Sequence, residues 1–266
     1  MKLTISGAAG RMGRAILESL YDEEDLELGS ALEKKRNPSV GRDAGELIGI
    51  GKWGIPVTDR IKKAVLDGEV MIDFTYPSET LKMVQEAQRK KKPMVIGTTG
   101  FLRDQEKKIK DASKKIPIVW SPNMSVGVNV MLKFLADAAN ILGEAYDVEI
   151  MEIHHRHKKD APSGTALRMG ETISAGRGAS LARVGRFSRH GKIGPRKTGE
   201  IGFQSQRAGD VVGEHTVTFA GPGERIEMTH RAHSRNNFSR GAILAAKWVA
   251  DQPPGLYDMM DVLGLK

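Results

Sequence analysis

The sequence has no cysteine among its 266 residues. This absence excludes disulfides, zinc sites with thiolate ligands and cysteine nucleophiles, and it is consistent with a reducing cytoplasm. We find no apolar run that approaches the roughly 20 residues a membrane span needs. The first residues enter a strand-like run and lack the apolar core and cleavage site of a signal peptide. We therefore expect a cytoplasmic protein with no membrane partner.

Aromatic residues are also scarce, at 5% of the sequence, whereas the net charge is +8. Basic residues gather at 89–92 and 177–197. Neither stretch carries the interleaved aromatics of a single-strand nucleic-acid platform. A generally basic surface is one interpretation of this charge. Attraction of an anionic small molecule is the other, and we expect such a partner rather than nucleic acid.

The first 120 residues alternate short apolar runs with amphipathic segments, which is typical of βαβ units around a parallel sheet. We predict five strands, at 2–6, 26–32, 70–74, 94–96 and 116–120. Between them we predict helices at 11–20, 78–91 and 103–114, with Ser78 as the N-cap of the second. This order predicts an α/β fold with an N-terminal Rossmann-type, doubly wound parallel sheet.

The pattern changes after Asn123. We predict helices at 126–142, from about Ser163 onward and at 238–250, and strands at 147–153, 200–206, 215–220 and 226–232. A stretch rich in glycine, arginine and lysine, 176–198, is predicted to be a long loop. These elements indicate a second, α+β domain with a mixed open sheet. Helices on one face only would leave the other face to be buried by oligomerisation.

Three glycines, Gly7, Gly10 and Gly13, follow the first predicted strand and open a helix. Glycines allow a tight turn and close backbone approach, and a helix N-terminus offers N–H groups to a pyrophosphate. The spacing G-x-x-G-x-x-G differs from the commoner G-x-G-x-x-G, so a purely structural turn is the alternative. We expect a dinucleotide to bind along the run Gly7, Ala8, Ala9, Gly10, Arg11, Met12 and Gly13.

An acidic residue, Glu33, ends the second predicted strand about 20 residues further on. Such a residue accepts hydrogen bonds from ribose hydroxyls and favours NAD, whereas the cations that follow it, Lys34 to Arg36, favour the 2′-phosphate of NADP. Having both predicts use of NADPH or NADH. A charged, solvated loop is the alternative for the three cations.

Further loops follow the other predicted strands of this sheet. Because ligands of open α/β sheets bind at the carboxyl ends of the strands, these loops are expected to border the nicotinamide. Each loop could also be a plain turn. The predicted cofactor contacts there are Phe74, Gly97, Thr98, Thr99, Ser121, Pro122 and Asn123.

The densest group of chemically active residues is EIMEIHHRHKKDAPSGTA, residues 149–166. Ser163, Gly164 and Thr165 open a helix and would cradle an anion. Lys158 can face a carboxylate, and a histidine can act as a general acid near neutral pH. The alternatives are a metal site, disfavoured by the cationic surroundings and ligand spacing, a Ser-His hydrolase, disfavoured by the lack of G-x-S-x-G, and a structural cluster. We expect no metal.

This run resembles the signature of the dihydrodipicolinate (4-hydroxy-tetrahydrodipicolinate) reductase family. The residues that match are Glu149, Ile150, Glu152, His154, Lys158, Asp160, Pro162, Ser163, Gly164, Thr165 and Ala166. GAAGRMG, GTTG, SVGVN at 125–129 and AGDVVGEHTVTF at 208–219 are also similar to that family, so the resemblance spans essentially the whole chain. Two residues depart from it: Ser121 replaces a common alanine, and Met124 replaces a common phenylalanine beside the nicotinamide.

The resemblance implies a dinucleotide-binding domain at 1–124, a substrate-binding and oligomerisation domain at 125–233, and a return to the first domain at 234–266. It implies that His154 is the proton donor, with Lys158 as its partner or as the donor itself. His155, Lys158, Ser163, Gly164 and Thr165 would bind the substrate carboxylates. Glu33 and Lys34 would contact the adenosine ribose, Met124 would join the cofactor site, and the protein would be a homotetramer.

The reaction implied by the resemblance is the reduction of a cyclic, conjugated imine with two carboxylates, in lysine and diaminopimelate biosynthesis. Hydride adds to the ring carbon conjugated with the imine, and an acid, His154 on this interpretation, protonates the adjacent carbon. Another Rossmann-fold dehydrogenase of a small anionic substrate is the alternative, and an NADPH-sensing regulator is a further one.

Overall fold

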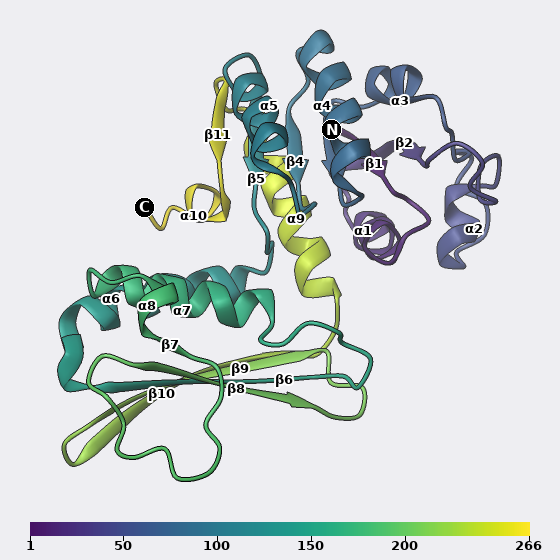
Figure 1. The fold of residues 1–266 in the computed structure, drawn as a ribbon. Coiled ribbons are helices and arrows are strands. Elements are labelled where there is room, and N and C mark those ends of the chain that lie inside the picture. The colour runs from purple at the N-terminus through teal and green to yellow at the C-terminus, as the bar shows by residue number, and fades with distance from the viewer. The chain divides into compact units, whose positions relative to one another are not determined.

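The computed structural model describes residues 1–266, which divide into two compact units. The first comprises Met1–Val126 and Arg235–Lys266, and the second comprises Gly127–Ser234. Each unit has a sheet of its own, and each is described separately below (Figure 1).

The sheet of the first unit has six strands, all parallel, in the order β11-β5-β4-β3-β1-β2. The chain first adds β2 on one side of β1 and then β3 on the other, so the strand order reverses at β1 and β3. This is the doubly wound Rossmann arrangement that the sequence predicts, and the fold class is confirmed. The strands are β1 Lys2–Ser6, β2 Glu27–Leu32, β3 Val70–Asp73, β4 Met94–Ile96, β5 Pro117–Trp120 and β11 Gly255–Tyr257.

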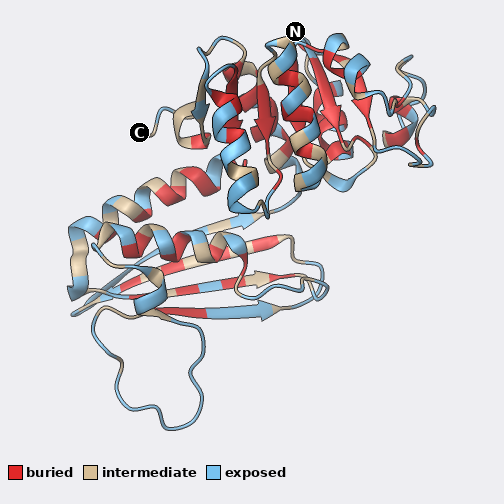
Figure 2. Ribbon diagram, turned by 45° about the horizontal axis from the view of Figure 1, so that its top comes forward, coloured by how far each residue is buried: buried red, intermediate tan, exposed pale blue.

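Helices cover both faces of this sheet, which is why the strands β1 to β5 are buried almost throughout rather than at alternate residues. Leu3, Ile5 and Ile72 pack in the core beneath α1 (Arg11–Tyr21) and α9 (Asn236–Val249). Met71 and Ile96 pack in the core on the opposite side, beneath α3 (Ile61–Asp67), α4 (Pro77–Lys90) and α5 (Arg103–Ser113). Figure 2 shows this sheet as a largely buried layer between helices that are exposed on their outer sides.

One predicted helix start is wrong. Helix α4 begins at Pro77 with Tyr76 as its N-cap, so Ser78 lies inside the first turn. Proline suits the first helical position, because its fixed φ is helical and its missing N–H would have no intrahelical partner there. Glu79 lies in the first turn, where an acid is favourable. Serine is a favoured N-cap residue, but here the proline before it already occupies the first helical position.

Several short elements of this unit were not predicted. They are α2 (Ala44–Ile48), α3, β11 and α10 (Met259–Val262). Helix α2 has only five residues, yet its N-cap Asp43 accepts hydrogen bonds from the N–H groups of Gly45, Trp53 and Gly54. Such elements depend on tertiary contacts more than on local periodicity, because isolated helices of this length are unstable.

The second unit has a five-stranded mixed sheet in the order β10-β9-β6-β8-β7. Strand β6 (Asp147–His154) pairs antiparallel with β9 (Gly213–Gly221) and parallel with β8 (Ile201–Arg207). Strand β10 (Glu224–Ala232) pairs antiparallel with β9, and β7 (Gly185–Arg186) pairs parallel with β8. The predicted mixed sheet is confirmed.

Helices α6 (Val126–Leu142) and α7 (Gly164–Gly176) lie along one face of this sheet, and its other face carries no helix (Figure 1). The buried residues of β6 therefore alternate and are Val148, Ile150, Glu152 and His154. The stretch Val126–Ala145 is long and apolar enough, with a mean hydropathy of 1.3, to cross a membrane by composition alone. The expectation that no run approaches that length is corrected, although α6 buries Met131 and Leu135 as a core helix does.

The predicted loop 176–198 is only partly irregular. It begins with the short helix α8 (Leu181–Val184) and strand β7. A Cβ at position 185 would lie within 3.0 Å of the carbonyl oxygen of Leu181, so this tight junction between α8 and β7 favours glycine. Beyond β7 the chain forms an extended loop that is exposed almost throughout (Figure 2).

Candidate active site

The first unit has a pocket of about 770 Å³ where β1, β2 and β3 end. This is the point at which the strand order reverses, and open α/β sheets bind their ligands there. The predicted cofactor residues that line the pocket are Gly7, Ala9, Gly10, Arg11, Met12, Glu33, Lys34 and Phe74. The structure thus gathers the glycine-rich loop, the acid and a cation around one pocket.

The glycine-rich loop has a backbone that fits a dinucleotide. Gly7 has a φ of +75°, a left-handed conformation that favours glycine. A Cβ at Gly13 would lie 2.1 Å from the carbonyl oxygen of Gly7, so no side chain fits where helix α1 crosses the loop. With Gly10 as the N-cap, the N-terminus of α1 lies beside the pocket. Its first-turn N–H groups suit a pyrophosphate.

The carboxylate of Glu33 is held in place from several sides. Its Oε1 accepts a hydrogen bond from the N–H of Ala9 at 2.9 Å, and its Oε2 accepts one from Asn37 Nδ2 at 2.8 Å. The backbone N–H of Lys34 also donates to Oε2. Glu33 is therefore tied to the glycine-rich loop, where an acceptor for ribose hydroxyls is expected. Asn37, which was not singled out from the sequence, is part of this arrangement.

The other predicted cofactor residues do not line this pocket. Ala8 is fully buried in the core, and Met124 is 1% exposed. Gly97 packs against Phe74, because a Cβ there would lie 2.0 Å from the phenyl ring. Thr98 is buried, and the hydroxyl of Ser121 donates to the carbonyl oxygen of Asn123. The assignment of Ala8, Gly13, Gly97, Thr98, Thr99, Ser121, Pro122, Asn123 and Met124 to the cofactor stays a prediction.

A buried carboxylate, Asp73, joins two of the loops at this edge of the sheet. Its Oδ1 lies within hydrogen-bond distance of the hydroxyls of Thr75 (2.7 Å), Thr80 (3.2 Å) and Thr98 (3.2 Å), and it accepts from the N–H of Thr75 (3.0 Å). The Oδ2 atom is buried without a partner. Burial outweighs the hydrogen bonds from the threonines and raises the pKa of Asp73 to about 6.

We expect Asp73→Asn to make the stability of the first unit less dependent on pH. Folding raises the pKa of Asp73 from 3.8 to about 6, so the folded protein binds this proton more tightly than the unfolded chain does. The stability that this tighter proton binding contributes is fully present below pH 3.8 and is lost as the pH rises through 6. At about 1.4 kcal/mol per pKa unit the whole shift corresponds to roughly 3 kcal/mol, and the variant should gain most of it, roughly 2.5 kcal/mol, relative to wild type between pH 4 and pH 7.5.

Urea unfolding at these pH values measures this difference. Tryptophan fluorescence reports the first unit selectively, because Trp53, Trp120 and Trp248 all lie in it. The exposed Asp210 offers a matched control, Asp210→Asn. A difference between wild type and Asp73→Asn that stays constant across the pH range would contradict the prediction.

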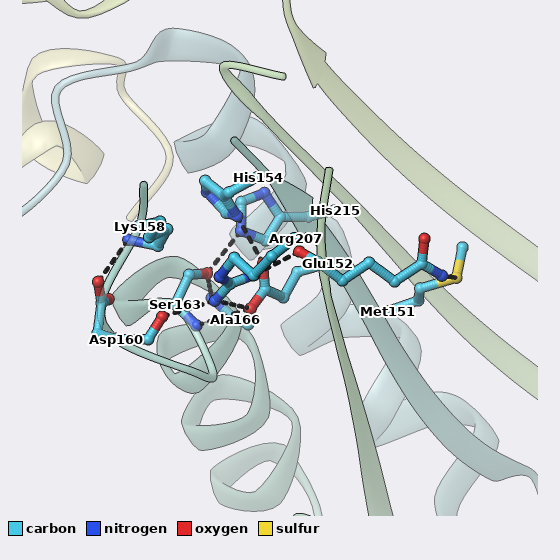
Figure 3. A network of polar contacts seen from close by, with 10 residues as sticks. Met151, Glu152, His154, Lys158, Asp160, Ser163, Ala166, Arg207 and His215 are labelled. Carbon is cyan, nitrogen blue, oxygen red and sulfur yellow. Dashed lines mark hydrogen bonds and ion pairs between the residues drawn. The ribbon is translucent and has the colours of Figure 1, made fainter. Parts of the chain in front are cut away.

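The second unit holds a chain of charged groups that leads to His154. The guanidinium of Arg207 donates two hydrogen bonds, each 2.8 Å long, to the carboxylate of Glu152. Glu152 Oε2 in turn lies 2.5 Å from Nδ1 of His154 (Figure 3). Glu152 and His154 are two residues apart on β6, so their side chains share the face that α7 covers. Register brings Arg207 opposite His154 on the neighbouring strand β8.

The pKa values follow from this burial and pairing. Burial alone would raise the pKa of Glu152, but hydrogen bonds, first of all from Arg207, lower it to about 2. Burial lowers the pKa of His154 below its ordinary value, although the hydrogen bond to Glu152 and its charge act in the opposite direction. A carboxylate on Nδ1 fixes the orientation of the ring and leaves Nε2 as its second proton-carrying position.

A glycine leaves room for that second nitrogen. A Cβ at Gly213, on β9, would lie 2.9 Å from Nε2 of His154, closer than real Cβ contacts come. The glycine at this position of the motif AGDVVGEHTVTF is therefore explained by the lack of space for a side chain beside the imidazole of His154.

Helix α7 begins next to this network. Ser163 is its N-cap and accepts a hydrogen bond from the N–H of Ala166 at 3.1 Å, and the N–H of Ser163 donates to Glu152 at 3.2 Å. The Ser163 hydroxyl also lies 2.8 Å from Nε2 of His215 on β9. Gly164 and Thr165 form the first turn, whose N–H groups suit a carboxylate. The predicted anion cradle thus lies beside His154 within one unit (Figure 3).

Lys158 and His155 are close in sequence but differ in their surroundings. The ammonium of Lys158 lies 2.9 Å from the carboxylate of Asp160, and the side chain of Lys158 is 20% exposed. The hydrogen-bond partner of His154 at Nδ1 is Glu152, and the role of Lys158 as partner of His154 or as the donor itself stays a prediction. The Nδ1 atom of His155 is buried without a partner. No group of three or more histidine, aspartate or glutamate side chains is arranged to hold a metal ion.

Three residues of this site were not predicted as functional: Glu152, Arg207 and His215. Glu152 could have been found, because strand alternation places it beside His154. The other two lie on β8 and β9, and only the register of the sheet brings them to His154.

Similarity to known proteins agrees with this architecture. Residues 1–124 match the family model described as dihydrodipicolinate reductase, N-terminus, and residues 127–263 match the one for its C-terminus. Proteins named 4-hydroxy-tetrahydrodipicolinate reductase from Syntrophus aciditrophicus and Nitrosospira multiformis are 50% and 51% identical over 266 residues. The alignments cover 100% of this chain and 99% and 98% of those proteins.

A solved structure has the same fold. It is the dipicolinate-bound dihydrodipicolinate reductase from Paenisporosarcina sp. TG-14, with a TM-score of 0.79 and 23% identity, and the match covers 98% of each chain.

A Rossmann sheet with a glycine-rich pocket where its strand order reverses, joined to a unit in which a buried histidine lies beside a helix N-terminus, defines a nicotinamide-dependent oxidoreductase. Its cofactor is NADH or NADPH. The chain belongs to the dihydrodipicolinate reductase family, whose reaction is the reduction of 4-hydroxy-tetrahydrodipicolinate. The family resemblance found in the sequence is confirmed.

Proposed function

We propose that the chain carries out this reduction with the 127–234 unit as its substrate-binding part and with His154 as the proton donor. The observation that carries the proposal is the Arg207–Glu152–His154 chain beside the N-terminus of α7. It combines an oriented imidazole with a place for carboxylates. The dicarboxylate substrate would be held by His155, Lys158, Ser163, Gly164 and Thr165.

The pocket where β1, β2 and β3 end, which Glu33 lines, would hold the adenosine end of the cofactor. Gly7 to Gly13 would take the pyrophosphate at the start of α1, and Glu33 and Lys34 would meet the ribose or its 2′-phosphate. The bound nicotinamide supplies the hydride that adds to the substrate ring.

The residues of the second unit then act on the substrate. Loss of water from 4-hydroxy-tetrahydrodipicolinate gives the conjugated imine that accepts the hydride. As the C–H bond forms on this imine, electrons move toward the ring nitrogen and the adjacent carbon, and His154 protonates that carbon. Lys158 and the start of α7 stabilise the carboxylates while charge redistributes. Glu152 holds the imidazole through Nδ1 and favours its protonated form, since the carboxylate opposes the lowering of the His154 pKa by burial. Lys158 is the second candidate for the proton donor, and the kinetics of His154→Ala and Lys158→Met decide between the two residues.

Oxidation of NADPH and of NADH, followed by absorbance with substrate generated enzymatically from pyruvate and aspartate semialdehyde, tests the activity. We expect turnover with both cofactors. A folded protein that shows no turnover with either would overturn the proposal. A related dehydrogenase activity would instead appear as oxidation of the cofactor with a different small anion.

We also propose a cytoplasmic homotetramer that binds neither nucleic acid nor membranes. The face of the second sheet that carries no helix supports oligomerisation (Figure 1). Across it, Thr216 and Thr229 lie 3.0 Å apart, Glu214 pairs with Arg231, and Met151 is 40% exposed. Such a mixed polar and apolar surface suits an interface between copies of one chain.

A further inference from the structure

His215 is a buried histidine that the proposed mechanism does not yet use. It lies on β9 opposite Glu152 and is 4% exposed. Its ring contacts that of His154 edge to face, with the centroids 5.2 Å apart. Its Nε2 lies 2.8 Å from the hydroxyl of Ser163. One side chain therefore contacts both the histidine proposed as proton donor and a proposed ligand of the substrate carboxylate (Figure 3).

The bond between His215 and Ser163 has two possible directions. A serine hydroxyl has one hydrogen to donate and two lone pairs to accept with. The N–H of Ala166 already occupies one lone pair of Ser163. If His215 Nε2–H donates, both lone pairs are filled and the hydroxyl hydrogen is left to point elsewhere. If Ser163 donates to His215, that hydrogen is used within the protein.

The other ring nitrogen decides between the two directions. Nδ1 of His215 is buried and has no hydrogen-bond partner. Were the proton on Nδ1, a buried N–H would lack an acceptor, which is rarer and costlier than an unfilled acceptor. The ring is neutral near pH 7, because burial, followed by the charge of His154, lowers its pKa to about 3. A neutral ring with its proton on Nε2 is therefore favoured.

We propose that His215 is a positioning residue for the reduction: by donating from Nε2 to Ser163, it commits the Ser163 hydroxyl to donate to a substrate carboxylate. The inference rests on the proposed role of Ser163 in substrate binding. In this arrangement the N–H of Ala166 and the ring of His215 fix the serine oxygen, and its one hydrogen remains for the ligand. The neutral state of His215 also adds no positive charge against a protonated His154.

Binding of dipicolinate to wild type, His215→Leu, Ser163→Ala and the double variant tests this. Ser163→Ala should weaken binding on the order of 10- to 100-fold, because it removes a hydrogen bond to a charged group. His215→Leu should weaken binding by about 3- to 10-fold and raise KM for the substrate, with kcat changed less. In the Ser163→Ala background, His215→Leu should have almost no further effect on binding, because the hydroxyl it positions is gone.

The outcomes separate the two proposals. If Ser163→Ala leaves dipicolinate affinity unchanged, the proposed role of Ser163 itself fails. If Ser163→Ala weakens binding but His215→Leu has no effect, or has the same effect with and without Ser163, only the role of His215 fails. Phe219→Leu is the matched control, since Phe219 is buried on the same face of β9. It should lower stability without changing dipicolinate affinity.

Nitrogen-15 NMR of the histidine rings tests the proton position in the wild-type protein. In the dipicolinate complex we expect a neutral His215 that carries its proton on Nε2 between pH 5 and pH 8. A proton on Nδ1, or a ring that titrates within this range, would overturn the proposal even if the variants do not fold.

Discussion

Replacing His154 by alanine is expected to lower kcat by a factor on the order of 10² to 10⁴, the usual contribution of one general acid. The affinity for NADPH should stay close to that of wild type. The pocket proposed for the cofactor lies in the first unit and contains no residue of β6. Steady-state kinetics gives kcat, and quenching or enhancement of NADPH fluorescence gives the cofactor affinity.

Two matched variants make the result specific. His157 is exposed in the turn that follows β6, and His157→Ala should leave kcat nearly unchanged. Lys158→Met distinguishes the two candidate donors. If His154 is the acid, Lys158→Met should chiefly raise KM, because it removes a cation that faces a carboxylate. A larger loss of kcat in Lys158→Met than in His154→Ala would assign the proton to Lys158. Equal losses of kcat and NADPH affinity in His154→Ala would contradict the role of His154.

The pH dependence offers a second readout of the same group. A general acid works in its protonated form, so kcat/KM should fall as the pH rises through the pKa of His154 in the free enzyme. Burial places that pKa below the ordinary histidine value. The descending limb should disappear in His154→Ala together with most of the activity.

The first unit was largely predictable from the sequence, for a simple physical reason. A parallel sheet covered on both faces requires short strands that are buried on both sides, and such predominantly apolar runs stand out between amphipathic helices. Strand β1 (Lys2–Ser6) and strand β4 (Met94–Ile96) have the predicted bounds. The start of α4 was misplaced because serine and proline compete as start signals, and proline at the first helical position prevailed.

The second unit was predictable in its elements but not in its contacts. Helix α6 has the predicted bounds, and Ser163 caps α7. The charged chain around His154 depends on register, which pairs His154 with Arg207 and Glu152 with His215. The local sequence pattern predicts which residues face the core. It does not fix the register between strands, and a shift of that register by one residue would turn Arg207 to the opposite face. The identity of these partners therefore required the structure.

Arg207→Met is expected to destabilise the second unit by about 3 kcal/mol. Glu152 has a fully buried side chain, and removing Arg207 leaves its buried carboxylate without a countercharge. Breaking a buried pair in this way typically costs about 3–5 kcal/mol. We expect the lower end of that range, because the side chain of Arg207 is 20% exposed and His154 can take up a proton to offset the loss.

Urea unfolding followed by circular dichroism, together with hydrogen exchange of peptides from β6, measures this cost. Arg189→Met is the matched control, because Arg189 pairs with the partly exposed Glu149 and should contribute about 1 kcal/mol or less. The double variant Arg207→Met with Glu152→Gln should recover much of the loss, since it also removes the unpaired charge. Equal destabilisation by Arg207→Met and Arg189→Met, or no recovery in the double variant, would show that the Arg207–Glu152 pair does not act as a buried charge pair. In that case the proposal that Glu152 orients His154 would also lose its support.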